Sequence, residues 1–109
     1  MKFSFKSISA AIQVAAVLSE MHRGTPLTIK ALSDATGLSV SYLEQIFSRF
    51  RTAGIVSSVR GPGGGYRLEK RDLTISDVIR SVSAGKIDFL DPVFAALDSV
   101  KISEIKAAV

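Results

Sequence analysis

The chain has 109 residues, of which 47% are hydrophobic and 22% are charged, a composition typical of one globular domain rather than of a disordered segment. It contains no cysteine and a single histidine, His22, which excludes disulfide frameworks and Cys-ligated zinc or iron–sulfur sites within these residues. One histidine without gathered carboxylates does not make a metal site, so we expect no metal and no other cofactor.

Charge is distributed unevenly along the chain. Residues 1–71 contain ten Lys/Arg and four Asp/Glu, a net charge of +6, whereas residues 72–109 contain four and six, a net charge of −2. A basic front part and a slightly acidic back part suit a polyanion-binding module joined to a segment with another role. The alternative is ordinary charge that keeps the protein in solution.

The first predicted element is an amphipathic helix from Ser7 to His22, because apolar residues recur there at helical spacing. Lys2 and Lys6 before an apolar run also allow a signal peptide, but polar residues interrupt the run and no small-x-small cleavage site follows. No stretch reaches the roughly 18 uninterrupted apolar residues of a membrane span. We therefore expect a cytoplasmic protein that does not contact the membrane.

Two further helices are predicted from their end signals. Thr28 is a candidate N-cap for a helix over residues 29–36, which Gly37 would end in a left-handed conformation. Ser39 is the next candidate N-cap, and a longer helix follows from Val40 to Ala53. Two helices joined by a turn that contains Gly form the helix-turn-helix pattern.

The longer of these helices has one apolar and one polar face. Its apolar residues have the i, i+3, i+4, i+7 spacing of a core-facing stripe: Leu43, Ile46, Phe47 and Phe50. Its polar residues repeat that spacing: Ser41, Glu44, Gln45 and Ser48. Gln can pair bidentately with adenine, Glu can accept from cytosine N4 and Ser can contact either partner, so this face suits base reading. Arg49 and Arg51 could reach phosphates, as could the N–H groups of the Ser39-capped turn. The alternative is a face that is merely solvated.

A change of period after residue 54 predicts a β-hairpin whose tip is the segment RGPGGGYR over residues 60–67. A simple reversal needs one Gly, so three consecutive glycines indicate a surface that comes very close to another backbone. Arg60 and Arg67 beside the tip would add charge-assisted phosphate contacts or enter a narrow minor groove. Tyr66 is expected to pack at the hairpin base.

The tip has three alternative interpretations, of which a dinucleotide-binding fingerprint is rejected on spacing and context. A phosphate-binding P-loop is rejected because no Gly-Lys-Ser/Thr follows the glycines and no long helix begins there. A flexible hairpin with incidental arginines stays open.

The back half predicts a helix and then an apolar stripe. Thr74 and Asp77 form a capping-box variant that begins a helix from Ile75 to Ala84, and Asp91 before a proline marks another start. The stripe is too apolar for a chain end to leave in water: Phe89, Leu90, Val93, Phe94, Leu97 and Val100. It either folds over the core or pairs with a second subunit, and we favour dimerisation because such DNA readers bind two-fold sites. No catalytic constellation is visible, so we expect no enzyme.

Three segments give the chain a resemblance to a known family. They are MKFSFKS at the start, LSVSYLEQIFSRFRTAGIVSSVRGPGGGY over residues 38–66 and LTISDVIRSV over residues 73–82. With these motifs the chain resembles the bacterial winged-helix regulators of the Rrf2 family over roughly residues 1–83. It looks most like the iron–sulfur cluster regulator branch, IscR.

The resemblance implies a dimeric transcription factor that binds imperfect palindromes. The recognition helix would enter the major groove, and the wing would follow the neighbouring minor groove. By motif position, the groove-reading residues would be Ser39, Ser41, Glu44 and Gln45, and the wing contacts would be Arg60, Gly61 and Pro62. In the IscR branch the glutamate of YLEQ helps to discriminate between classes of site, a role that would fall on Glu44.

The chain departs from the family in one respect. Sensing members place three cysteines before the dimerisation helix, but here only residues 85–88 lie between Ala84 and Phe89. Residues 89–100 look like a shortened dimerisation helix, and residues 101–109 like a short terminal one. The resemblance therefore implies a DNA-binding dimer without an iron–sulfur sensor. A protein partner, a cluster-bearing relative in a heterodimer, a small-molecule effector or constitutive binding remain open.

Together these observations predict a mainly α fold with a small β-hairpin wing. A winged helix-turn-helix domain would occupy residues 1–84, and a dimerisation helix with a C-terminal tail would occupy residues 85–109. The predicted function is a sequence-specific transcriptional regulator, a repressor that binds a palindromic operator in double-stranded DNA as a homodimer. The alternative is a protein-interaction module that modulates a related regulator by heterodimerisation. Such a module would not need Gln45, Arg60 or the tip glycines.

Overall fold

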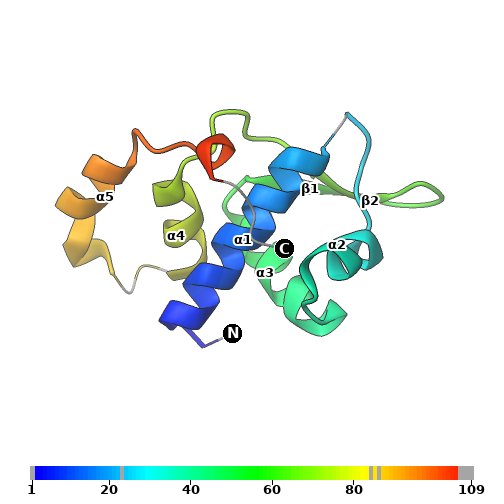
Figure 1. Cartoon of the computed structure of the whole chain (residues 1–109), viewed down its shortest axis with the longest axis horizontal. Coiled ribbons are helices and arrows are strands. Elements are labelled where there is room, and N and C mark those ends of the chain that lie inside the picture. The colour runs from blue at the N-terminus through cyan, green and yellow to red at the C-terminus, as the bar shows by residue number, and fades with distance from the viewer. Residues whose placement is uncertain (1, 23, 84, 86, 106–109) are drawn as a thin grey trace.

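The computed structural model describes residues 2–22, 24–83, 85 and 87–105 (Figure 1). Its helices are α1 Phe5–Met21, α2 Ile29–Thr36, α3 Val40–Thr52, α4 Ile75–Ser83 and α5 Asp91–Leu97. Its strands are β1 Val56–Val59 and β2 Gly65–Leu68, and two 3-10 turns, η1 and η2, span Asp88–Leu90 and Ile102–Glu104. The predicted fold class, mainly α with a β-hairpin wing, is confirmed.

Helix α1 forms the centre of the fold and packs against α2, α4 and η2 (Figure 1). It begins two residues earlier than the sequence pattern predicted because Ser4 and Ser7 form a capping box. The Ser4 hydroxyl accepts from the Ser7 N–H at 3.2 Å, and the Ser7 hydroxyl accepts from the Ser4 N–H at 2.8 Å. Of the helices in the described part of the chain, none is long and apolar enough to cross a membrane.

The helix-turn-helix is built from the predicted end signals. The Thr28 hydroxyl accepts from the Ala31 N–H at 3.0 Å, Gly37 ends α2 with φ +76°, and the Ser39 hydroxyl accepts from the Tyr42 N–H at 3.1 Å. The apolar stripe of α3, from Leu43 to Phe50, is fully buried. Because both ends of the turn are fixed, α3 is held with its polar side outward.

The wing is an antiparallel hairpin in which Val56 lies opposite Leu68 and Val59 opposite Gly65. Its base is tied to the segment before α2, since Leu27 and Tyr66 exchange backbone hydrogen bonds of 2.8 and 2.7 Å. The Tyr66 ring stacks on Phe47 with centroids 4.5 Å apart, so the predicted packing of Tyr66 at the hairpin base is confirmed.

Two of the wing glycines meet the chain's own backbone. Gly65 has φ +145°, and a Cβ there would collide with the carbonyl group of Leu27. A Cβ on Gly64 would collide with the carbonyl oxygen of Val59. The close approach expected from the glycine run is therefore an internal one at these two positions.

The segment after α4 differs from the single helix expected over residues 89–100. Turn η1 precedes α5, and α5 ends at Leu97. The chain leaves the helix because it pairs with the strand-like segment before α4: Ile75 donates to the Val100 carbonyl at 3.0 Å and Ile102 to the Leu73 carbonyl at 2.8 Å. Of the expected terminal helix over residues 101–109, the structure has η2, and residues 106–109 lie outside the described part.

Figure 1 shows α5 and the hairpin tip at opposite ends of the molecule, with α4 between α5 and α1. The surface of α3 therefore lies between a projecting wing and the C-terminal segment.

Candidate nucleic-acid interface

The polar face of α3 forms one wall of an open groove of about 760 Å³. Ser41, Glu44, Gln45 and Ser48 are all exposed and line it, as the sequence pattern predicted. Helix α4 supplies the facing wall through Arg80 and Ser81. Most of the residues that line the groove carry a hydroxyl, amide or charged group, and these groups hydrogen-bond to base edges and phosphates.

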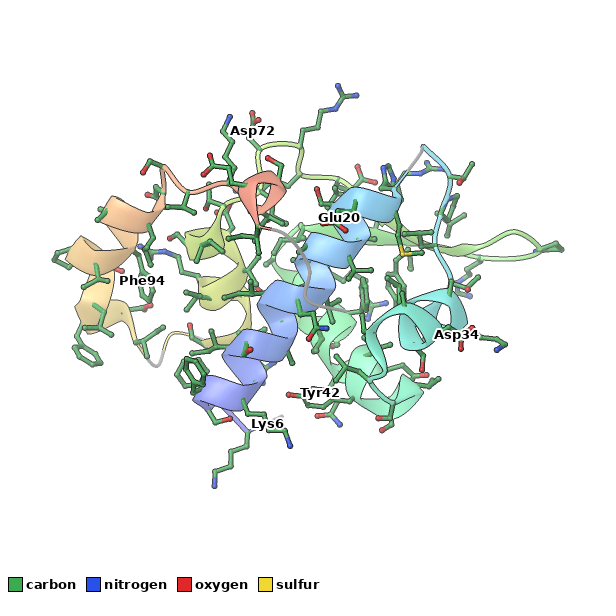
Figure 2. The ribbon with its side chains drawn as sticks, viewed as in Figure 1. Lys6, Glu20, Asp34, Tyr42, Asp72 and Phe94 are labelled. Atoms are coloured by element: carbon green, nitrogen blue, oxygen red, sulfur yellow. The ribbon has the colours of Figure 1, made fainter. Side chains whose placement is uncertain are left out.

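A second groove of about 480 Å³ lies at the start of α3. Lys2, which precedes α1, and Lys6, in its first turn, line this groove together with Ser39, Tyr42 and Gln45. Figure 2 shows Lys6 and Tyr42 near each other at the lower edge of the molecule. Gln45 lines both grooves, so a ligand that spans them would contact the Gln45 side chain.

The predicted phosphate-binding arginines are distributed over separate surfaces. Arg49 is half-buried and lines the larger α3 groove, whereas the exposed Arg51 lies outside its lining. Arg60 is exposed at the start of the wing tip, as are Gly61 and Pro62. Arg67 lies on β2 opposite Ser57 and lines a different groove, of about 590 Å³, with His22 and Arg71.

Lys2, Lys6 and Arg80 line the two grooves but were not among the residues predicted for the site. In the sequence the two lysines indicate only a possible signal peptide, and Arg80 lies in a helix with no base-reading pattern. The fold brings each of them beside α3 from a distant part of the sequence, so no local signal near α3 could have found them.

Helix α4 is fixed at its start by the predicted capping box. The Thr74 N–H donates to the Asp77 carboxylate at 3.0 Å, and the Asp77 N–H donates to the Thr74 hydroxyl at 3.1 Å. Burial raises the pKa of Asp77, but the hydrogen bonds from Thr74 and the Lys70 ammonium, 3.0 Å away, outweigh burial and hold that pKa below its ordinary value. This ionised cap orients the helix that presents Arg80.

The apolar stripe predicted for dimerisation divides into two sets. Phe94 is 3% exposed and packs inward, and Leu97 and Val100 are half-buried against the core. Phe89 and Val93 are 78% and 51% exposed, and Leu90 is also exposed. Only the second set is available to another molecule.

Several curated proteins are similar to part of this chain. The IscR transcriptional regulator of Vibrio atlanticus (strain LGP32) is 52% identical over 60 residues, which cover 53% of this chain and 35% of that protein. The IscR regulator of Vibrio vulnificus (strain YJ016) is 56% identical over 52 residues, 48% of this chain and 31% of that protein. The match thus spans about a third of the length of these curated relatives.

The residues present do not fit an iron–sulfur cluster. The sequence has no cysteine, and in residues 2–22, 24–83, 85 and 87–105 no three His, Cys, Asp or Glu side chains gather to hold a metal ion. The ligand chemistry of such a cluster requires thiolates or imidazoles close together. The described residues therefore do not bring together the donor set of such a cluster.

Solved structures match the fold over most of its length. The IscR of T. potens superposes with a TM-score of 0.73 at 29% identity, covering 95% of this chain and 85% of that chain. CymR (YrzC), the global cysteine regulator of B. subtilis, gives 0.73 at 28% identity and covers 95% of both chains. The family model of Rrf2, described as an iron-dependent transcriptional regulator, matches residues 6–107. Since that match spans nearly the whole chain, the protein belongs to the Rrf2 family of transcriptional regulators.

Proposed function

We propose that this protein is a sequence-specific DNA-binding regulator that reads bases with α3 and contacts the phosphate backbone with its wing. The observation that carries the proposal is the α3 surface: an exposed row of Ser, Glu and Gln side chains with cations on both sides. Lys2 and Lys6 lie at one end of that row and Arg49 at the other. This arrangement matches a duplex, whose bases lie between two charged backbones.

In this proposal the predicted contacts have separate tasks. Ser39, Ser41, Glu44 and Gln45 read the groove, and Arg49, Arg51, Arg60 and Arg67 hold phosphates. Gly61 and Pro62 are the wing contacts at the tip beside Arg60. The active form is a homodimer on a palindromic operator, joined through the exposed apolar residues of the C-terminal segment, Phe89, Leu90 and Val93. We propose that residues 1–84 bind DNA and residues 85–109 dimerise, without an iron–sulfur sensor.

The proposed regulator is a repressor in the cytoplasm. A dimer that occupies an operator blocks other proteins by exclusion and needs no further contact to act. A reporter gene placed behind the selected operator should lose expression when the chain is supplied, and a rise in expression would make the protein an activator instead.

The primary test is selection from a random duplex pool at about 0.15 M salt, the physiological ionic strength, followed by sequencing. We expect a palindrome with half-sites about one helical turn apart. A pool without an enriched motif would exclude sequence-specific reading.

Two variants distinguish base reading from phosphate binding. Gln45→Ala should relax preference at one or two base pairs by about 1–3 kcal/mol. Arg60→Ala should weaken binding to all sequences and lower the salt slope by about one.

A second candidate function is a protein-interaction module that pairs with a related regulator. The exposed Phe89 and Val93 favour it, because they leave apolar surface uncovered. The two candidates differ in the selection experiment: the module would give no motif alone and would alter the motif of its partner.

A further inference from the structure

Arg80 connects the C-terminal segment to the α3 surface. Its Nη1 donates to the Asp91 carboxylate at 2.9 Å, and its Nε donates to the Ser76 hydroxyl at 3.2 Å. Its guanidinium carbon lies 4.8 Å from the centroid of the Phe94 ring. Figure 2 shows Phe94 on the side of α5 that faces α4. The same arginine lines the groove beside the polar face of α3.

The charges of that groove depend on Arg80. Glu44, Arg49 and Arg80 are the charged residues of its lining. The negative charge of Glu44 offsets the positive charge of Arg49. Arg80 therefore supplies the excess positive charge that attracts a polyanion. Asp91, the first residue of α5, now neutralises it.

The ion pair between Arg80 and Asp91 is open to competition. The side chains of Arg80 and Asp91 are 41% and 58% exposed, and exposed ion pairs contribute little to stability. A guanidinium has five N–H donors, and it binds a phosphate with the same forked geometry that it offers to a carboxylate. A DNA phosphate near α4 could therefore take the place of Asp91.

We propose that Arg80 is a further phosphate-binding residue and that Asp91 competes with DNA for it. The inference rests on the proposed DNA-binding function and adds a contact from outside the helix-turn-helix and the wing. Ser76 and Phe94 position the guanidinium at the edge of the groove. DNA binding and the seating of α5 against α4 are then coupled through one side chain.

The test measures the affinity of the full chain for its selected operator and for an unrelated duplex over a salt series. Arg80→Gln should weaken binding to both duplexes by roughly fivefold at 0.15 M salt and reduce the salt slope by about 0.9, as expected for one lost phosphate contact. Lys101→Gln is the matched control, because Lys101 also pairs with an aspartate, Asp72, at 3.6 Å and is absent from the groove lining. The control should leave the slope unchanged.

Asp91→Asn tests the competition. It should strengthen binding to both duplexes, whereas Asp98→Asn, which removes the same charge from the other end of α5, should not. In the Arg80→Gln background Asp91→Asn should have no effect, since the two residues act on one contact. Equal gains from the two asparagine variants, or a gain that persists without Arg80, would overturn the competition.

Arg80→Lys separates charge from folding. A lysine keeps the charge, so the salt slope should stay that of the wild type even though the fork is lost. A slope as low as that of Arg80→Gln would assign the effect to loosened α5 packing and overturn the phosphate contact. Wild-type protein that selects no motif refutes the proposed function, whereas selective wild-type binding that Arg80→Gln leaves unchanged refutes this inference alone.

Discussion

Helix α3 and the C-terminal segment around α5 both have an apolar stripe, but only α3 buries the whole of it. The apolar stripe of α3 is completely buried, and its polar residues face outward. In the C-terminal segment Phe94 alone of the six stripe residues is fully buried, while Phe89 and Val93 stay in water. The polar groups that α3 exposes can hydrogen-bond to water or to a polar ligand. The C-terminal segment instead exposes apolar side chains, and only another apolar surface would cover them favourably.

The largest expected effect concerns the buried apolar stripe of α3. Phe47 is fully buried, stacks on Tyr66 and meets Phe50 edge-on at 5.6 Å. Phe47→Ala should therefore lower the free energy of unfolding by about 3–5 kcal/mol, measured by urea denaturation. Ser48→Ala, on the exposed face of the same helix, is the control and should stay within about 0.5 kcal/mol of the wild type. A loss below 1 kcal/mol for Phe47→Ala would show that α3 and the wing base are not packed together as described.

An intermediate effect concerns the cap that orients α4 between the two regions. Asp77→Asn removes the carboxylate that accepts from the Thr74 N–H and pairs with Lys70, and it should cost about 1 kcal/mol of unfolding free energy at neutral pH. Because folding lowers the pKa of Asp77 below the ordinary 3.8, its contribution is present above that value and is lost as the pH falls through the folded pKa.

The difference between Asp77→Asn and wild type should therefore shrink below pH 3.8 in a series of denaturation curves. Asp72→Asn is the control, since the side chain of Asp72 is 85% exposed. A pH-independent loss would attribute the effect of Asp77→Asn to helix geometry rather than to the charge.

The smallest expected effect on folding concerns the exposed apolar residues of the C-terminal segment. Phe89→Ser should change the unfolding free energy of the monomer by less than about 0.5 kcal/mol, because the ring is already exposed. The same variant should abolish the proposed dimer in sedimentation equilibrium. Phe5→Ser is the matched control, with a phenylalanine that is 84% exposed on α1. Loss of the dimer with Phe5→Ser but not with Phe89→Ser would move the interface to α1.

The elements with local end signals could be predicted from the sequence. Thr28, Gly37 and Ser39 act within three or four residues of themselves, as does the Thr74–Asp77 capping box. The polar and apolar faces of α3 also follow from spacing alone, since the helix is long enough to show its period. The start of α1 was missed by two residues because serine at both ends of a capping box is a weaker signal than serine with glutamate.

The C-terminal segment could not be predicted to the same degree, because its structure depends on distant residues. Asp91 resembled a helix cap, but its carboxylate pairs with Arg80, eleven residues earlier. The end of α5 is set by backbone bonds from Ile75 and Ile102 to Val100 and Leu73, which no local pattern encodes. The same reason explains why Lys2 and Lys6 were not assigned to the start of α3.

The internal fit of the wing glycines affects how wing mutants should be interpreted. A side chain at Gly64 would separate the two strands at Val59, and one at Gly65 would separate the hairpin from Leu27. Such variants change the shape of the wing before they remove a contact to DNA. A weakened regulator with a substitution there would report a misassembled hairpin. Gly64 approaches only backbone atoms of Arg60 and does not approach Pro62. The side chains of both residues are exposed, so substitutions there are the ones whose change in binding reports the ligand contact itself.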